Sequence, residues 1–249
     1  MKAIDLLKRV PTTTVHQSRL QVFQPTRRPK DIERKILTPW GEAKISGKIG
    51  QVHADILEAM CKNAKDHRVT DTGQIQLLVD PYVVRKSVGG GKTYSGDTLW
   101  KMIQELRKTS IELAAPAQGV RVMGGVIDMV EESIQVTGHN GEKRYLWRVT
   151  LSPAYAALVA GDLPLHYDPA PLALIESGIS QAIARHIMTH RDQPEGGWSL
   201  DKLIKAVGAG NTPVELRNRR REVNQDAENL RRLGIGIKGG RVFRETESV

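Results

Sequence analysis

Residues 212–233 read TPVELRNRRREVNQDAENLRRL, and this stretch decides the fold expected for the chain. Pro213 suits the first position of a helix, where its missing N–H costs nothing, and Gly234 follows as a stop signal. At 100° per residue, four apolar side chains cluster on one side of such a helix, and they form its expected buried stripe: Leu216, Val223, Ala227 and Leu230. The sequence therefore predicts one amphipathic helix from Pro213 to about Leu233.

The opposite face of this predicted helix suits the major groove of DNA. An arginine can donate two hydrogen bonds to guanine, asparagine or glutamine can pair with adenine, and valine can touch the methyl group of thymine. Basic side chains at the borders of such a face would meet phosphates. The exposed row comprises Val214, Asn218, Arg221 and Gln225, at spacings of four, three and four residues, with Arg217 and Arg232 at or near its borders. We expect these side chains to contact double-stranded DNA.

The competing interpretation is a solvated helix whose arginines pair with Glu222, Asp226 and Glu228. Such pairs stabilise a helix by only about 0.2–0.5 kcal/mol each. They also leave unexplained why four arginines crowd the first half of the helix and three carboxylates the second. Positive charge at a helix N-terminus opposes the helix dipole, which favours an anionic partner.

Outward from this helix, residues 165–249 have the pattern of a helix-turn-helix followed by a β-hairpin wing. The expected elements are a helix over 172–190, a short helix over 200–207 capped by Ser199, the arginine-rich helix, and a hairpin turning at Gly239-Gly240. Three prolines and two aspartates in 161–171 mark the boundary before them. These features predict a winged-helix domain over 165–249.

The same order of elements occurs once before, over residues 45–164. We expect helices over 49–66, 82–88 and from Ser95 onward, a strand over 75–79, and strands over 111–114, 120–129 and 145–151, with a short helix over 153–160. The chain is thus predicted to be an α+β protein with two tandem winged-helix domains. Residues 1–44 precede them as a basic N-terminal arm that ends near a short strand at Ala43–Ile45.

Charge is unevenly distributed along the chain. The 249 residues carry a net charge of +9, with a pI near 9.7. Residues 1–50 hold 11 Lys and Arg against 4 Asp and Glu, and residues 199–249 hold 11 against 7, whereas residues 110–198 hold 6 against 10. A basic excess confined to the two ends favours a surface directed at a polyanion such as nucleic acid.

Composition excludes several classes of protein. Cys61 is the only cysteine, which rules out an intrachain disulfide and a cysteine-rich zinc site. No apolar run approaches the roughly 18 residues that cross a bilayer, and the N-terminus lacks the apolar core of a signal peptide. We therefore expect a cytoplasmic protein without a membrane partner.

Several short motifs resemble functional sites but lack a required residue. Gly89–Thr93 reads GGGKT, but Lys86 stands where a P-loop needs its first glycine. His186 and His190 are one helical turn apart without the glutamate of an H-E-x-x-H site, so they are expected to be core histidines. Glu42-Ala43-Lys44 lacks the preceding acidic residue of a metal nuclease, and no G-x-S-x-G nucleophile elbow occurs. The sequence predicts no catalytic residue, cofactor or metal.

Three stretches resemble the plasmid replication initiators of the iteron-binding Rep type, which have two tandem winged-helix domains. They are DTLWKMIQELRKTSIE (97–112), VTLSPAYAAL (149–158) and the helical succession over 175–233. The resemblance lies in arrangement and scattered residues over about 45–245, and the basic arm has no counterpart in the family.

The resemblance implies binding to repeated origin sites, duplex opening and recruitment of a replicative helicase. It also implies a bacterial protein associated with the nucleoid or a plasmid. In the family the C-terminal winged helix contacts bases, while the first contacts the DNA backbone and often forms the dimer interface. Base contacts then fall on the row of the arginine-rich helix. Backbone contacts fall near Arg85, Lys86, Lys92, Thr93 and Lys101. Two other functions stay open: a winged-helix transcriptional regulator, such as a repressor, and a nucleic-acid enzyme with a cryptic site.

Overall fold

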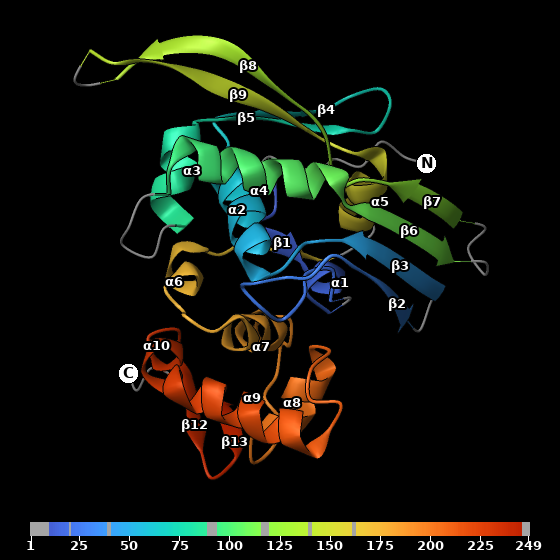
Figure 1. Ribbon diagram of the computed structural model, residues 1–249, viewed down its shortest axis with the longest axis vertical. Coiled ribbons are helices and arrows are strands. Elements are labelled where there is room, and N and C mark those ends of the chain that lie inside the picture. Colours follow the sequence, from blue (N-terminus) through green and yellow to red (C-terminus); the bar gives the residue numbers. More distant parts are fainter. Residues whose placement is uncertain are drawn as a thin grey trace.

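The computed structural model describes residues 10–19, 21–38, 41–88, 94–115, 120–138, 141–160 and 163–245. These residues form α-helices and four small antiparallel sheets, so the predicted α+β class is confirmed (Figure 1). None of the described helices has the length and apolar character needed to cross a membrane.

The chain has two halves, which we define as residues 32–160 and 170–245. The first half is built on a central helix, α2 (Gln51–Lys62), whose side chains are almost all buried. After it come β4 (Asp66–Val69), β5 (Ile75–Val79), α3 (Pro81–Val88) and α4 (Gly96–Lys108). A hairpin of β8 (Ile127–Thr137) and β9 (Lys143–Leu151) completes a sheet of order β4-β5-β9-β8. This sheet lies along α4 at the top of Figure 1. Ser95 caps α4, since its hydroxyl accepts a bond from the backbone N–H of Thr98 at 3.1 Å. Ser199, the predicted cap of the helix over 200–207, stands at the N-cap position but its side chain makes no such bond.

A second sheet of the first half has the order β2-β3-β6-β7. Its strands are β2 (Ile32–Thr38), β3 (Gly41–Gly47), β6 (Ser110–Ala115) and β7 (Val120–Gly124). The single strand predicted over 120–129 is wrong, because the chain leaves this sheet after Gly124 and enters the other one at Ile127. At the crossing, α5 (Pro153–Ala160) packs so closely that a Cβ on Gly124 would stand 2.9 Å from that of Ala154.

The second half repeats the order of elements on a smaller scale. It contains α6 (Ala170–Ala173), α7 (Gly178–Met188), β11 (Trp198–Ser199), α8 (Leu200–Ala206), α9 (Pro213–Gln225), α10 (Ala227–Arg231), β12 (Ile235–Lys238) and β13 (Arg241–Arg244). The sheet order is β11-β13-β12. Each half thus has a helix, a strand, two helices and a hairpin whose second strand pairs with the earlier strand.

Two predicted long helices are each interrupted, and one contact explains both interruptions. The helix over 213–233 breaks at Asp226, and the helix over 172–190 breaks at 174–177. The buried Asp226 carboxylate accepts bonds from the backbone N–H groups of Glu176 (3.3 Å) and Ser177 (2.9 Å). It therefore satisfies otherwise unpaired donors at the start of α7, which a straight helix through Asp226 could not do.

The N-terminal segment departs from the free basic arm expected over 1–44. We call residues 10–31 the strap. It contains β1 (Thr13–Thr14), which pairs with β10 (Pro164–Leu165), and α1 (Val15–Arg19). Val22 and Phe23 are buried in the core of the first half. The strap is folded against both halves because much of it is apolar or hydrogen-bonded, despite its positive charge.

The buried apolar side chains form two separate cores. The first gathers α2, β5, α4 and both sheets of the first half around residues such as Ile56, Leu77 and Leu106. The second gathers α7, α8, α9 and β13 around Ile183, Ile204 and Val242. In Figure 1, α2 and α7 lie between α4 above and α9 below. Because of this stacking, the outer faces of α4 and α9 lie away from the contact between α2 and α7.

Candidate nucleic-acid interface

Local interactions fix the start and the orientation of α9. Thr212 Oγ1 accepts a bond from the Glu215 N–H, and the Glu215 carboxylate accepts one from the Thr212 N–H, both at 3.2 Å. Pro213 occupies the start of the helix, as predicted. Val223 is fully buried and Leu216 packs against the second core. The sequence thus determines which face of α9 points outward.

The outward face of α9 carries the predicted row. Val214 is 59% exposed, although an isolated valine favours burial. Arg217, Asn218, Arg221 and Gln225 are exposed as well. Within the described part of the chain, no hydrogen bond or ion pair engages the side chains of Arg217, Asn218 or Arg221. These donors are free for an external partner.

The other two arginines of α9 have partners. Arg219 pairs with Glu222 one turn along at 2.9 Å, and Arg220 pairs with Asp201 at the start of α8 at 2.5 Å. The hydrogen bond from Arg220 lowers the pKa of Asp201 and raises that of Arg220. The competing interpretation of a helix whose arginines pair with its own carboxylates therefore describes Arg219 only. Arg220 pairs outside the helix, and Arg217 and Arg221 have no partner among the described residues.

The hairpin beside α9 adds a basic edge that the sequence analysis missed. Gly239 and Gly240 have φ angles of 57° and 71°, the left-handed conformation that a tight hairpin turn requires. Lys238 and Arg241 flank this turn with exposed side chains. In the sequence, this basic edge is indicated by one basic residue on each side of the Gly239-Gly240 pair. Arg232, predicted to meet phosphate, is exposed at the end of α10, beyond the break at Asp226.

In the first half, the predicted residues have different environments. Arg85 is half-buried: it donates to the Tyr94 carbonyl at 3.1 Å and its guanidinium lies 5.8 Å from the centre of the Tyr82 ring. Lys86 and Lys101 are exposed on α3 and α4. Lys92 and Thr93 lie outside the described residues. Helix α3, rather than a strand, leads toward Gly89–Thr93, an arrangement unlike that of a P-loop.

His186 and His190, which the sequence predicts to be core histidines, lie half-buried at the edge of the second core. Their Nε2 atoms are 3.3 Å apart, and the His190 ring lies 5.8 Å from that of Trp198. Burial, with added repulsion from His190 and Arg19, lowers the pKa of His186 to about 4. Burial and the nearby Arg19 and Arg244 likewise lower the pKa of His190, so both imidazoles are neutral near pH 7. No group of three potential metal ligands occurs among the residues that the structure describes.

Comparisons with family models, curated proteins and solved structures find no significant match to this chain. The candidate site therefore depends on the geometry of α9 and its hairpin. That geometry combines unpaired guanidinium and amide groups, one exposed valine and a basic turn. Such a surface can donate hydrogen bonds to base edges and phosphates.

Proposed function

We propose that the chain is a sequence-specific DNA-binding protein that initiates plasmid replication. The observation that carries the DNA-binding part is the row on α9. Arg217, Asn218 and Arg221 are exposed without partners there, whereas the neighbouring Arg219 and Arg220 are paired. A helix that leaves its best base-contacting side chains free, next to arginines that it uses internally, is suited to a major groove.

Each half is proposed to be a winged helix. The order helix, strand, helix, helix, hairpin supports this in both halves, with α3–α4 and α8–α9 as the helix pairs and β8–β9 and β12–β13 as the wings. In the second half, α9 would enter the major groove while Lys238 and Arg241 meet phosphates. In the first half, Lys86 and Lys101 would meet the DNA backbone, together with Lys92 and Thr93.

Initiation, rather than regulation alone, is supported by two unlike DNA-binding units in one chain and by the resemblance to the Rep initiators. The partners would be repeated origin sites in duplex DNA, a replicative helicase and a second copy of the chain bound through the first half. We assign it no catalytic residue, cofactor or metal. A transcriptional repressor with the same fold would bind DNA equally well, so replication itself must be assayed.

Binding is tested by selecting bound duplexes from a random library with the full chain and measuring their affinity. Arg221→Ala should weaken binding to the selected duplex more than to random DNA. Arg121→Ala is the matched control, because it removes an exposed arginine that pairs with Glu112 on a distant sheet. Equal loss with both variants would contradict the assignment of α9.

Initiation is tested by placing the gene with its flanking DNA on a plasmid that has no other origin. Transformants should form with the wild-type gene and be lost with Arg221→Ala. A parallel assay places the same flanking DNA upstream of a reporter gene. If the protein lowers transcription of that reporter but does not support replication of the plasmid, the repressor is favoured.

A further inference from the structure

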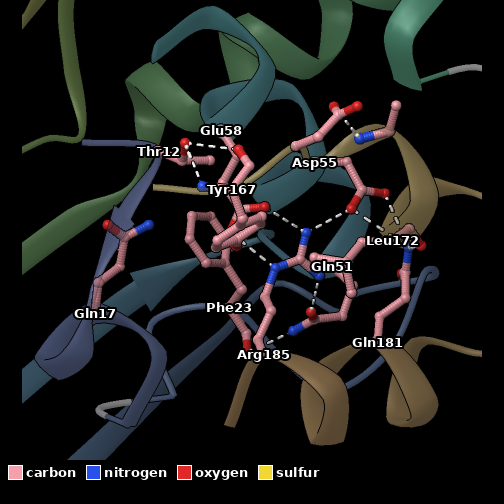
Figure 2. Close-up of polar contacts among 12 residues, drawn as sticks. Thr12, Gln17, Phe23, Gln51, Asp55, Glu58, Tyr167, Leu172, Gln181 and Arg185 are labelled. Atoms are coloured by element: carbon pink, nitrogen blue, oxygen red, sulfur yellow. Dashed lines mark hydrogen bonds and ion pairs between the residues drawn. The ribbon is translucent and has the colours of Figure 1, made fainter. Parts of the chain in front are cut away.

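A buried charge cluster joins the two halves at the contact between α2 and α7 (Figure 2). Arg185 of α7 is 5% exposed, and Asp55 and Glu58 of α2 are 0% and 1% exposed. The Arg185 guanidinium donates to both Glu58 oxygens at 2.8 Å, to Asp55 at 2.6 Å and to the Gln51 side-chain oxygen at 2.7 Å. One arginine of the second half is thus held by three side chains of the first.

Two further side chains complete the cluster. Gln181 of α7 donates to Asp55 at 3.1 Å and to the Leu172 carbonyl at 2.8 Å. Arg27 of the strap lies 3.5 Å from the Asp55 carboxylate. Two guanidinium groups therefore balance two carboxylates. Burial pushes the pKa of Glu58 upward and Arg185 opposes that shift, so the pair depends on close contact.

The strap ties the same two halves together a second time. Arg19 donates to Thr189 Oγ1 at 3.0 Å and Gln21 donates to the Ala206 carbonyl at 2.9 Å, both in the second half. Arg27 bridges Ile175 of the second half and Tyr94 of the first, each at 3.2 Å. At Gly178 the strap backbone passes so near that an added Cβ would lie 2.4 Å from Thr26.

We infer that this junction fixes the separation and phase of the two DNA-binding units, with Arg185 as a positioning residue. A small rotation of one half would leave Asp55 or Glu58 buried without its guanidinium, which is strongly unfavourable. Buried polar groups can select one arrangement in this way, as a single buried asparagine selects the register of a coiled coil. The inference rests on the proposed function, because it needs both units to contact DNA.

Fixed geometry has a direct consequence for the DNA site. The site should contain two contacted segments at one invariant spacing, because the protein cannot adjust the distance between α4 and α9. B-DNA turns once in about 10–10.5 base pairs, so an insertion of 5 base pairs moves one segment to the opposite side of the duplex. An insertion of 10 base pairs restores the side but lengthens the span.

The test starts from duplexes selected by the full chain from a random 40-base-pair library, with hydroxyl-radical footprints to locate the protected segments. The wild type should protect two segments at constant spacing. Insertions of 5 and of 10 base pairs between them should each weaken binding at least tenfold. A flexible molecule would tolerate the 10-base-pair insertion.

Arg185→Ala should reduce the penalty of the 10-base-pair insertion below that of the wild type, although the strap still joins the halves, while the segment contacted by α9 stays protected. Arg121→Ala should retain the wild-type penalty. Thermal melts show whether Arg185→Ala is folded, and if it is not, the wild-type insertion series alone decides. Binding within twofold on both inserted duplexes, or a single protected segment, would overturn fixed spacing and leave specific DNA binding intact. Failure to select any duplex would overturn the proposed function and this inference with it.

Discussion

The arginines of α7 and of α9 belong to the same half of the molecule and have opposite environments. Arg185 is buried, and its guanidinium is saturated by Asp55, Glu58 and Gln51. Arg221 is exposed, and no described residue pairs with it. The contrast shows that the partners of an arginine decide its role: the first holds the fold together, and the second is available to a ligand. Changes at three arginines test this contrast, and a change at His186 tests the end of α7 beside the buried one.

The largest effect is expected from Arg185→Ala. It leaves two carboxylates buried without their guanidinium and should lower the free energy of unfolding by about 3–5 kcal/mol. Urea unfolding followed by circular dichroism measures this. Arg220→Ala removes an exposed, solvent-screened pair with Asp201 and should lower the free energy of unfolding far less. A loss for Arg185→Ala no larger than that for Arg220→Ala would contradict the assigned role of the cluster.

A second effect concerns acid stability and depends on His186, the residue that follows Arg185 in α7. The pKa of His186 is about 4 in the folded chain, below its ordinary value near 6.5. Between these values the imidazole binds more protons in the unfolded chain than in the folded one. The contribution of His186 to the free energy of unfolding is therefore constant above about pH 6.5, decreases as the pH falls toward 4 and levels off below it. The loss should reach up to about 3 kcal/mol.

His186→Gln should remove part of this slope in urea melts between pH 7 and pH 4. His166→Gln, a change at an exposed histidine, is the control and should leave the slope as in the wild type. An unchanged slope in His186→Gln would show that other groups carry the acid sensitivity.

Arg221→Ala should cost about 1–3 kcal/mol of binding at the selected duplex and relax the preference at one base position, without lowering the melting temperature. Titrations on selected and random duplexes, with melts alongside, measure both quantities. Leu216→Ala should instead lower the melting temperature without changing base preference, since it removes a side chain that packs on the second core. If Arg221→Ala bound both duplexes as the wild type does, Lys101 and Lys92 would be the next residues to change.

The smallest effect is expected from Arg232→Ala. Its side chain lies beyond the break at Asp226, where we expect the chain to leave the groove and an exposed arginine to meet only phosphate. The variant should weaken specific and random binding alike and reduce the slope of log affinity against log salt by about one. Affinities at several salt concentrations give the slope. An unchanged slope would remove Arg232 from the interface.

Local patterns predicted most elements correctly, for identifiable reasons. The strand over 75–79, the helix after Ser95 and the hairpin at Gly239-Gly240 follow from alternation, capping and glycine at positive φ. The outward face of α9 follows from its buried stripe. The predictions were wrong where a contact distant in sequence changed the local structure. The helix over 213–233 breaks at Asp226, which accepts a bond from the start of α7, and the strand over 120–129 ends at Gly124, against which α5 packs.

The sequence by itself determined the α+β class, the candidate base-contacting row and its orientation, because helix periodicity and caps act within a few residues. Only the tertiary structure decided which arginines are free. Arg85, Arg185 and Arg220 find partners 9, 127 and 19 residues away, and no spacing rule reveals such partners. The strap likewise has a basic composition typical of a free arm, yet its apolar side chains and its hydrogen bonds to both halves place it at the junction.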